Sequence, residues 1–358
     1  MISRIIVAIT LAFGASATFA QTPQYIANVD ALCKQAQSAG NIPGMVVTVT
    51  NGNTVAFQKA YGVISSPNGA SPNGNTVFGM GGLTQAITAF AVLQLAEQGK
   101  FKLDEPASKY VSDMPKNWKT ITIRQFLDNS SGIPALKGGA DWDEALDFAE
   151  GKPLTFTPGS QEKKESGNYA MLGQLIEKTS GMTYAKYVQD HIFAPAGMVR
   201  SGVGISDSNV ATTYGKTAKT PTKPKATKKA DYMVPVTGLQ TSSNDLVKWE
   251  QTMFAGKLLN SNSYHQMFMP AVASAKSAKK AFALGWEEHV VGPDTIVYAG
   301  SATAFIEIDL HRGIAVIVLQ NMDAGGEAEK LANNIMKQSV GVIGTAPKRR
   351  RHPKHPYF

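Results

Sequence analysis

Strand-like sequence lies at both ends of this chain, and helix-like sequence lies between the two ends. Near the start, GMVVTVTNGNTVAFQKAYG contains two β-rich runs joined at Asn51-Gly52-Asn53, which is a strong hairpin signal. Near the end stand four further strand-like runs: ALGWEEHVV, TIVYAG, AFIEIDL and GIAVIVLQN. Strands so far apart in sequence complete a sheet by pairing with one another, so the pattern predicts one antiparallel sheet assembled from both termini.

Helical periodicity accounts for most of the remaining chain. The segment from Pro23 to Gly40 and the closing GGEAEKLANNIMKQSV have helix-spaced apolar residues. Between the strand regions the same spacing recurs in TQAITAFAVLQLAEQGK, TIRQFLDNS, YAMLGQLIEKTSG, TYAKYVQDHIF and SNDLVKWEQTMFAG. The predicted fold class is therefore α/β of the α+β type, with helices flanking the sheet and a mostly helical subdomain inserted at about 80–275. A ligand cleft is expected between the sheet edge and this subdomain.

The first twenty residues, MISRIIVAITLAFGASATFA, have the features of a secretory signal peptide. An early Arg4 precedes a short apolar run, and small residues end at Ala20. We therefore expect a signal peptide at 1–20, a single domain at 21–345, and a periplasmic or secreted protein. No later run approaches the ~20 apolar residues of a transmembrane helix.

The formal charge of +8 is concentrated in two segments, KTAKTPTKPKATKK (216–229) and the terminal PKRRRHPKHPYF. Both contain few apolar residues, so we expect a solvated loop and a basic disordered tail at 346–358. The functional alternative is weak electrostatic contact of these segments with anionic envelope polymers or lipid head groups. Nucleic acid is not an expected partner of an exported protein. The single cysteine, Cys33, excludes an internal disulfide and is expected to be a buried thiol.

Several stretches, in this order and spacing, resemble one known superfamily over about 26–340. They are VLQLAEQGKFKLDEPASKYV, ITIRQFLDNSSGIP, TPGSQ, YAMLGQLIEKTSGMTYAKYVQDHIFAPAGM, GLQTSSNDLVKW, ALGW and AFIEIDLHRGIAVIVLQN. The resemblance is to the serine β-lactamase and penicillin-binding-protein-like superfamily, in its class C β-lactamase, D-alanyl-D-alanine carboxypeptidase and esterase branch. It implies the β-lactamase/transpeptidase-like fold and covalent acyl transfer by three motifs.

Each of those motifs has a chemical task. A serine at the start of a buried helix attacks the carbonyl, and a lysine one turn later takes its proton. A tyrosine or serine in the second motif relays protons, and its asparagine partner holds substrate. The third motif brings a cationic or imidazole side chain, with a glycine that lets substrate approach the backbone.

This chain departs from all three motifs. In FGMGGLTQAITAF, Gly82 and Gln85 stand where the serine and lysine belong, and neither a glycine nor an amide can replace them. The remaining motif positions hold Lys164 for the tyrosine, Ser166 for the asparagine, and Tyr298 and Gly300 in the third motif. We therefore expect a catalytically inactive relative, a pseudoenzyme, that binds a peptidoglycan-like peptide or an envelope protein.

The residues expected to line the retained cleft are Gln85, Lys164, Glu165, Trp286, Tyr298 and Gly300. No metal or other cofactor is expected. The alternative is a hydrolase with a rearranged site, in which Lys164, Glu165 or Tyr298 supplies the base. Thr84 is the nearest hydroxyl, but it should point to a different helix face. The SxxK match at Ser277–Lys280 falls in a polar run that predicts a loop.

Overall fold

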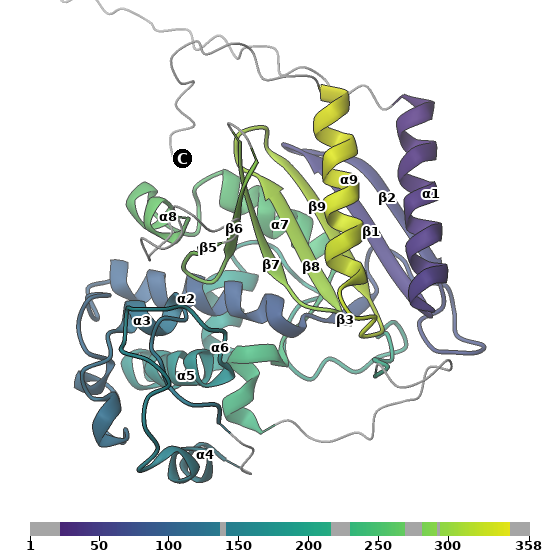
Figure 1. The fold of residues 1–358 in the computed structure, drawn as a ribbon. Helices are drawn as coiled ribbons and strands as arrows, with labels where there is room; N and C mark the ends of the chain where they lie inside the picture. Colours follow the sequence, from purple (N-terminus) through teal and green to yellow (C-terminus); the bar gives the residue numbers. More distant parts are fainter. Residues whose placement is uncertain (1–21, 137–140, 216–229, 269–280, 292–293, 344–358) are drawn as a thin grey trace, which may run out of the picture.

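The computed structural model describes residues 22–136, 141–215, 230–268, 281–291 and 294–343 (Figure 1). The first half of the chain forms α1 (Pro23–Gly40), β1 (Gly44–Asn51), β2 (Thr54–Gly62), β3 (Val77–Gly79), η1 (Gly81–Leu83), α2 (Thr84–Glu97), η2 (Ala107–Lys109), η3 (Lys116–Trp118), α3 (Ile123–Leu127), α4 (Trp142–Ala149) and α5 (Ser166–Ser180). The second half forms α6 (Tyr184–Val188), η4 (Gln189–Phe193), η5 (Asp231–Met233), η6 (Val234–Gly238), β4 (Gln240–Ser242), α7 (Ser243–Phe254), α8 (Ser261–Met267), β5 (Ala281–Phe282), β6 (Glu287–Val291), β7 (Asp294–Gly300), β8 (Ala304–Asp309), β9 (Ile314–Gln320) and α9 (Glu327–Ile343).

Four features predicted from the sequence lie outside the described residues. They are the signal peptide, the lysine-rich segment 216–229, the SxxK match at Ser277–Lys280 and the basic tail. Among the described helices, none combines the length and apolar character that a membrane span requires.

The main sheet confirms the prediction that both ends of the chain build one antiparallel sheet. Its strand order is β2-β1-β9-β8-β7-β6-β5, so the N-terminal hairpin joins the C-terminal strands where β1 pairs with β9. The hairpin between β1 and β2 turns at Gly52, whose φ of +54° suits a residue without a Cβ. The β8–β9 turn lies beside this hairpin, since the Gly52 N–H donates to the Gly313 carbonyl at 2.7 Å. Asp309 accepts hydrogen bonds from the backbone of His311 and Arg312 and so fixes the β8–β9 turn.

The two faces of the sheet are covered differently. Helices α1 and α9 lie side by side over one face (Figure 1), and Val29, Cys33 and Leu331 pack there against the strands. The other face packs against α2, α7 and the helical region, in one large apolar cluster. Because both faces are covered, β8 and β9 are buried along their full length, which explains their nearly continuous apolar sequence.

Helix α2 is the central helix of the inserted region. Ten of the fourteen residues of TQAITAFAVLQLAE are buried, which suits a helix with apolar residues on all sides. A short second sheet, β3 with β4, fixes the chain just before it, and the Met80 amide donates to the Leu239 carbonyl at 2.8 Å. These contacts place the start of α2 beside the end of β7, which is where the cleft lies.

Candidate functional site

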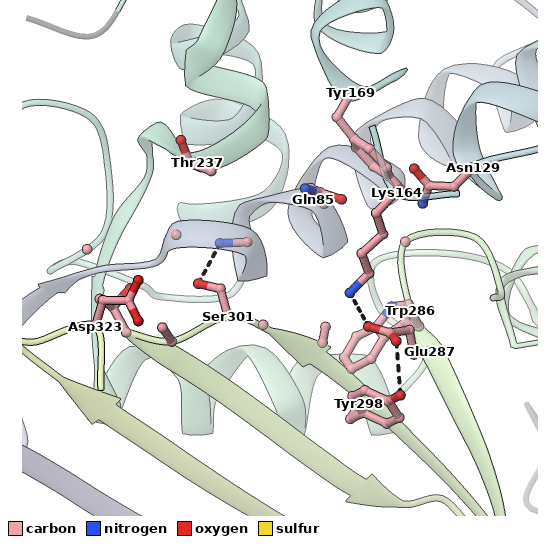
Figure 2. A pocket seen from close by; sticks show the side chains of 18 of the residues that line it. Gln85, Asn129, Lys164, Tyr169, Thr237, Trp286, Glu287, Tyr298, Ser301 and Asp323 are labelled. Atoms are coloured by element: carbon pink, nitrogen blue, oxygen red, sulfur yellow. Dashed lines mark hydrogen bonds and ion pairs between the residues drawn. The ribbon is translucent and has the colours of Figure 1, made fainter. Parts of the chain in front are cut away.

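A cleft of about 890 Å³ lies between the start of α2, the segment before α5, and strands β6 and β7 (Figure 2). Its walls are mostly neutral. The lining residues are Gly79, Gly81, Gly82, Gln85, Asn129, Lys164, Tyr169, Thr212, Thr213, Thr237, Phe282, Gly285, Trp286, Glu287, Tyr298, Ala299, Gly300, Ser301, Ala302, Thr303 and Asp323. Five of the six residues predicted to line the cleft do so; Glu165 does not.

The first motif places no reacting group in the cleft. Gly82 has no side chain, and a Cβ added there would lie 3.0 Å from the Gly300 carbonyl oxygen and 3.2 Å from the Ser301 Cβ. Gln85, one turn later, also lines the cleft, and its side chain has no hydrogen-bond partner among the described residues. Its amide can donate and accept hydrogen bonds but does not titrate near neutrality.

Ser301 fills the space next to Gly82. Its hydroxyl accepts a hydrogen bond of 3.0 Å from the Gly82 backbone N–H (Figure 2). Its own backbone N–H donates to the Ala304 carbonyl at 2.8 Å. Acyl transfer requires free N–H donors aimed at the developing oxyanion. Both of these N–H groups, which lie beside the position of the missing nucleophile, are bound within the protein.

Gly300 is required by the turn that follows β7. Its φ is +143°, and a Cβ there would lie 2.2 Å from the Ala304 carbonyl oxygen. The family resemblance implies that this glycine allows close approach of a substrate. The structure gives a different reason, because the β7–β8 hairpin itself leaves no room for a side chain.

Lys164 and Tyr298 both contact Glu287, a residue that was not predicted to belong to the site. The Lys164 ammonium forms an ion pair with Oε1 of Glu287, and the Tyr298 hydroxyl donates to Oε2 of the same carboxylate at 3.0 Å. Tyr298 and Glu287 are direct partners in the β6–β7 register. Burial, followed by the neighbouring Glu287 carboxylate, raises the pKa of Tyr298 well above its ordinary value, so this phenol stays protonated.

The rest of the second motif turns away from the cleft. The Glu165 carboxylate pairs with Lys163 at 2.7 Å, and Glu165 and Ser166 lie at the start of α5 outside the lining. The prediction that Glu165 lines the cleft is therefore wrong, because its carboxylate forms an ion pair with the neighbouring Lys163 instead. Thr84 is fully buried and does not line the cleft, in agreement with the prediction that it points to a different face of the helix.

Trp286 borders the cleft but belongs mainly to the core. Only 2% of its surface is exposed, and its ring stacks on Trp249 with centroids 5.8 Å apart. Asn129, which the sequence analysis did not select, reaches the cleft from a left-handed backbone position with φ of +60°. Its Oδ1 accepts a hydrogen bond of 2.9 Å from Asn168, which holds the amide in place.

Ser301 and Asp323 were also missed, although each follows a predicted strand. Ser301 comes directly after Gly300, and Asp323 lies just beyond β9. Polar residues at strand ends were the available signal. Within the described residues, no group of three or more His, Cys, Asp or Glu side chains is arranged to hold a metal ion.

Comparison with known proteins agrees with this architecture. The profile of the family described as Beta-lactamase matches residues 29–339. The chain belongs to the beta-lactamase family. A relative in this family, PbpX of Bacillus subtilis (strain 168), is named as a penicillin-binding protein and is 31% identical over 240 residues, which cover 64% of this chain and 60% of the relative. The chain thus spans less than two thirds of that relative's length.

Two solved structures have the same fold as this beta-lactamase family member. The octameric penicillin-binding protein homologue from Pyrococcus abyssi has a TM-score of 0.76 and 22% identity, over 88% of this chain and 77% of that one. EstCE1, described as a hydrolase with promiscuous acyltransferase activity, has a TM-score of 0.75 and 19% identity, over 89% of this chain and 98% of that one. At these identities the similarity shows the fold alone.

Proposed function

We propose that this protein is an exported beta-lactamase family member that binds its ligand without forming an acyl-enzyme, and that it acts in binding or scaffolding in the cell envelope. One observation carries the proposal. Gly82 and Gln85 replace the nucleophile and the base, and the Gly82 N–H is already bound to Ser301 in a cleft that remains open. Without a positioned nucleophile and base, covalent acyl transfer has no starting step.

A peptidoglycan-like peptide or an envelope protein is the proposed partner. The cleft is large enough for a peptide segment, and its neutral amides and hydroxyls are groups that bind peptides. A family relative named as a penicillin-binding protein is consistent with this class of ligand. The proposed export predicts that the protein is found outside the cytoplasm after cell fractionation.

The alternative, a hydrolase with a rearranged site, has weaker support. Lys164 and Tyr298 are both engaged by Glu287, and Glu165 lies outside the cleft. Ser301 is the exposed serine hydroxyl in the cleft, but within the described part of the chain no base forms a hydrogen bond with its oxygen. A nucleophilic serine requires such a base.

Covalent labelling tests the proposal. Purified protein is incubated with a fluorescent penicillin and separately with a fluorophosphonate, beside an active family member as the positive control. We expect no labelled band from this protein. A stoichiometric adduct that maps to the cleft would overturn the proposal. Turnover of chromogenic esters or D-alanyl peptides, abolished by Ser301→Ala, Lys164→Met or Glu165→Gln, would instead support the rearranged hydrolase.

A further inference from the structure

The charges in the cleft limit which ligands it can hold. Among the described residues that line it, the charged side chains are Lys164, Glu287 and Asp323. The lining therefore has one cation and two carboxylates. A ligand entering the cleft meets an excess of negative charge.

The one cation in this set is already neutralised. Lys164 forms its ion pair with Glu287, and Tyr298 donates to the other oxygen of the same carboxylate. Both Glu287 oxygens are therefore used, and they hold the ammonium at one end of the cleft (Figure 2). An incoming carboxylate would have to compete with Glu287 for Lys164 and would lie close to a like charge.

Asp323 stands at the opposite end of the cleft (Figure 2) and has no ion-pair partner within the described chain. One of its oxygens accepts a hydrogen bond of 3.1 Å from the Gly325 backbone, and its own N–H donates to the Tyr214 carbonyl at 3.2 Å. These contacts fix the position of a half-buried carboxylate. Between the two ends lie neutral groups, which include Gln85 and Ser301.

We infer that the cleft selects a peptide ligand that places an ammonium group at Asp323 and has no carboxylate near Lys164. The inference rests on the proposed function, because it describes what binds to a cleft that does not react. Penicillins and D-alanyl-terminated peptides each have a carboxylate, for which the described cleft offers no free cation. Specificity here comes from Asp323, which has no ion-pair partner among the described residues, as well as from repulsion of a ligand carboxylate near Glu287.

Three matched probes test this inference by isothermal titration calorimetry. The first is Nα-acetyl-lysyl-D-alanyl-D-alanine amide, which has an ammonium and no carboxylate. The second is the same peptide as the free acid, and the third is the amide with its lysine Nε acetylated. We expect the first probe to bind about fivefold more tightly than either of the others, which is about the effect of one partly exposed charge pair.

Variants assign the preference to particular residues. Asp323→Asn is expected to remove the difference between the ammonium probe and its acetylated form. Asp143→Asn, at an exposed site on α4 outside the cleft, makes the same charge change and should leave that difference intact. Glu287→Gln releases Lys164 from its ion pair and is expected to strengthen binding of the free acid.

The possible results separate the two proposals. Binding of the free acid as tight as that of the amide, or no binding of any probe, would overturn the inference about charge. A covalent adduct with penicillin would overturn the proposed function instead. Absence of an adduct together with absence of any charge preference would leave the proposed function standing and refute only this inference.

Discussion

Glu250 makes the stability of this protein depend on pH in a direction that the structure specifies. This carboxyl on α7 is fully buried, and the Thr50 hydroxyl lies 2.8 and 2.9 Å from its two oxygens. No described residue forms an ion pair with it. Burial raises the pKa of Glu250 to about 8, because the charged form is poorly solvated in the core.

The magnitude follows from proton linkage. Between pH 4.5, the ordinary pKa of this side chain, and about pH 8, the unfolded chain has lost the proton that folded Glu250 keeps. The free energy of unfolding therefore falls as pH rises, by about 1.4 kcal/mol per pH unit. Over the interval the loss reaches about 5 kcal/mol, and it levels off above pH 8.

Urea denaturation of the wild type and Glu250→Gln between pH 5 and pH 9 measures this effect. Glutamine keeps the shape and can accept the Thr50 hydrogen bond, but it does not titrate. We expect the variant to gain stability relative to the wild type as pH rises to 8. Burial also raises the pKa of Glu307 to about 8, but this residue is present in both proteins, so their difference isolates Glu250. Parallel pH profiles for the two proteins would refute the reasoning.

Three smaller predictions follow from other contacts. Gly300→Ala should lower the free energy of unfolding, measured by thermal melting, by at least about 2 kcal/mol. The control Gly151→Ala, at a position with positive φ but open space around it, should lower it by about 1 kcal/mol, and equal losses would contradict this. Ser301→Ala should lower the free energy of unfolding, measured by urea denaturation, by less than about 1 kcal/mol, because water can replace the hydroxyl at the Gly82 N–H. A larger loss would be inconsistent with an open cleft. Burial raises the pKa of Cys33 to about 12, so a maleimide should label it in urea and not in the native protein, where rapid labelling would count against its burial.

The sheet and the principal helices could be predicted because they follow from regular sequence patterns. Alternating and continuous apolar runs marked β1, β2 and the C-terminal strands, and helix-spaced residues marked α1, α2, α5 and α9. The β3–β4 pair and β5 were missed, since strands of two or three residues are too short to show periodicity. These short strands are recognised only from their pairing with a partner strand in the folded protein.

The candidate site was predicted where a family motif fixes the position, as at Gly82, Gln85 and Gly300. It was missed where position depends on strand register or loop path. Glu287 enters the site because it pairs with Tyr298 across β6 and β7, and no local pattern encodes that pairing. Asp323 enters because the chain after β9 passes beside Tyr214, whose carbonyl accepts a hydrogen bond from the Asp323 N–H.

Intact-protein mass spectrometry tests the central claim most directly. The purified protein is incubated with a penicillin and with a fluorophosphonate over an extended time course, and its mass is recorded at intervals. The proposed cleft, which binds a ligand without forming an acyl-enzyme, predicts an unchanged mass throughout. A single stoichiometric adduct, localised by peptide mapping to a cleft residue such as Ser301, would contradict it.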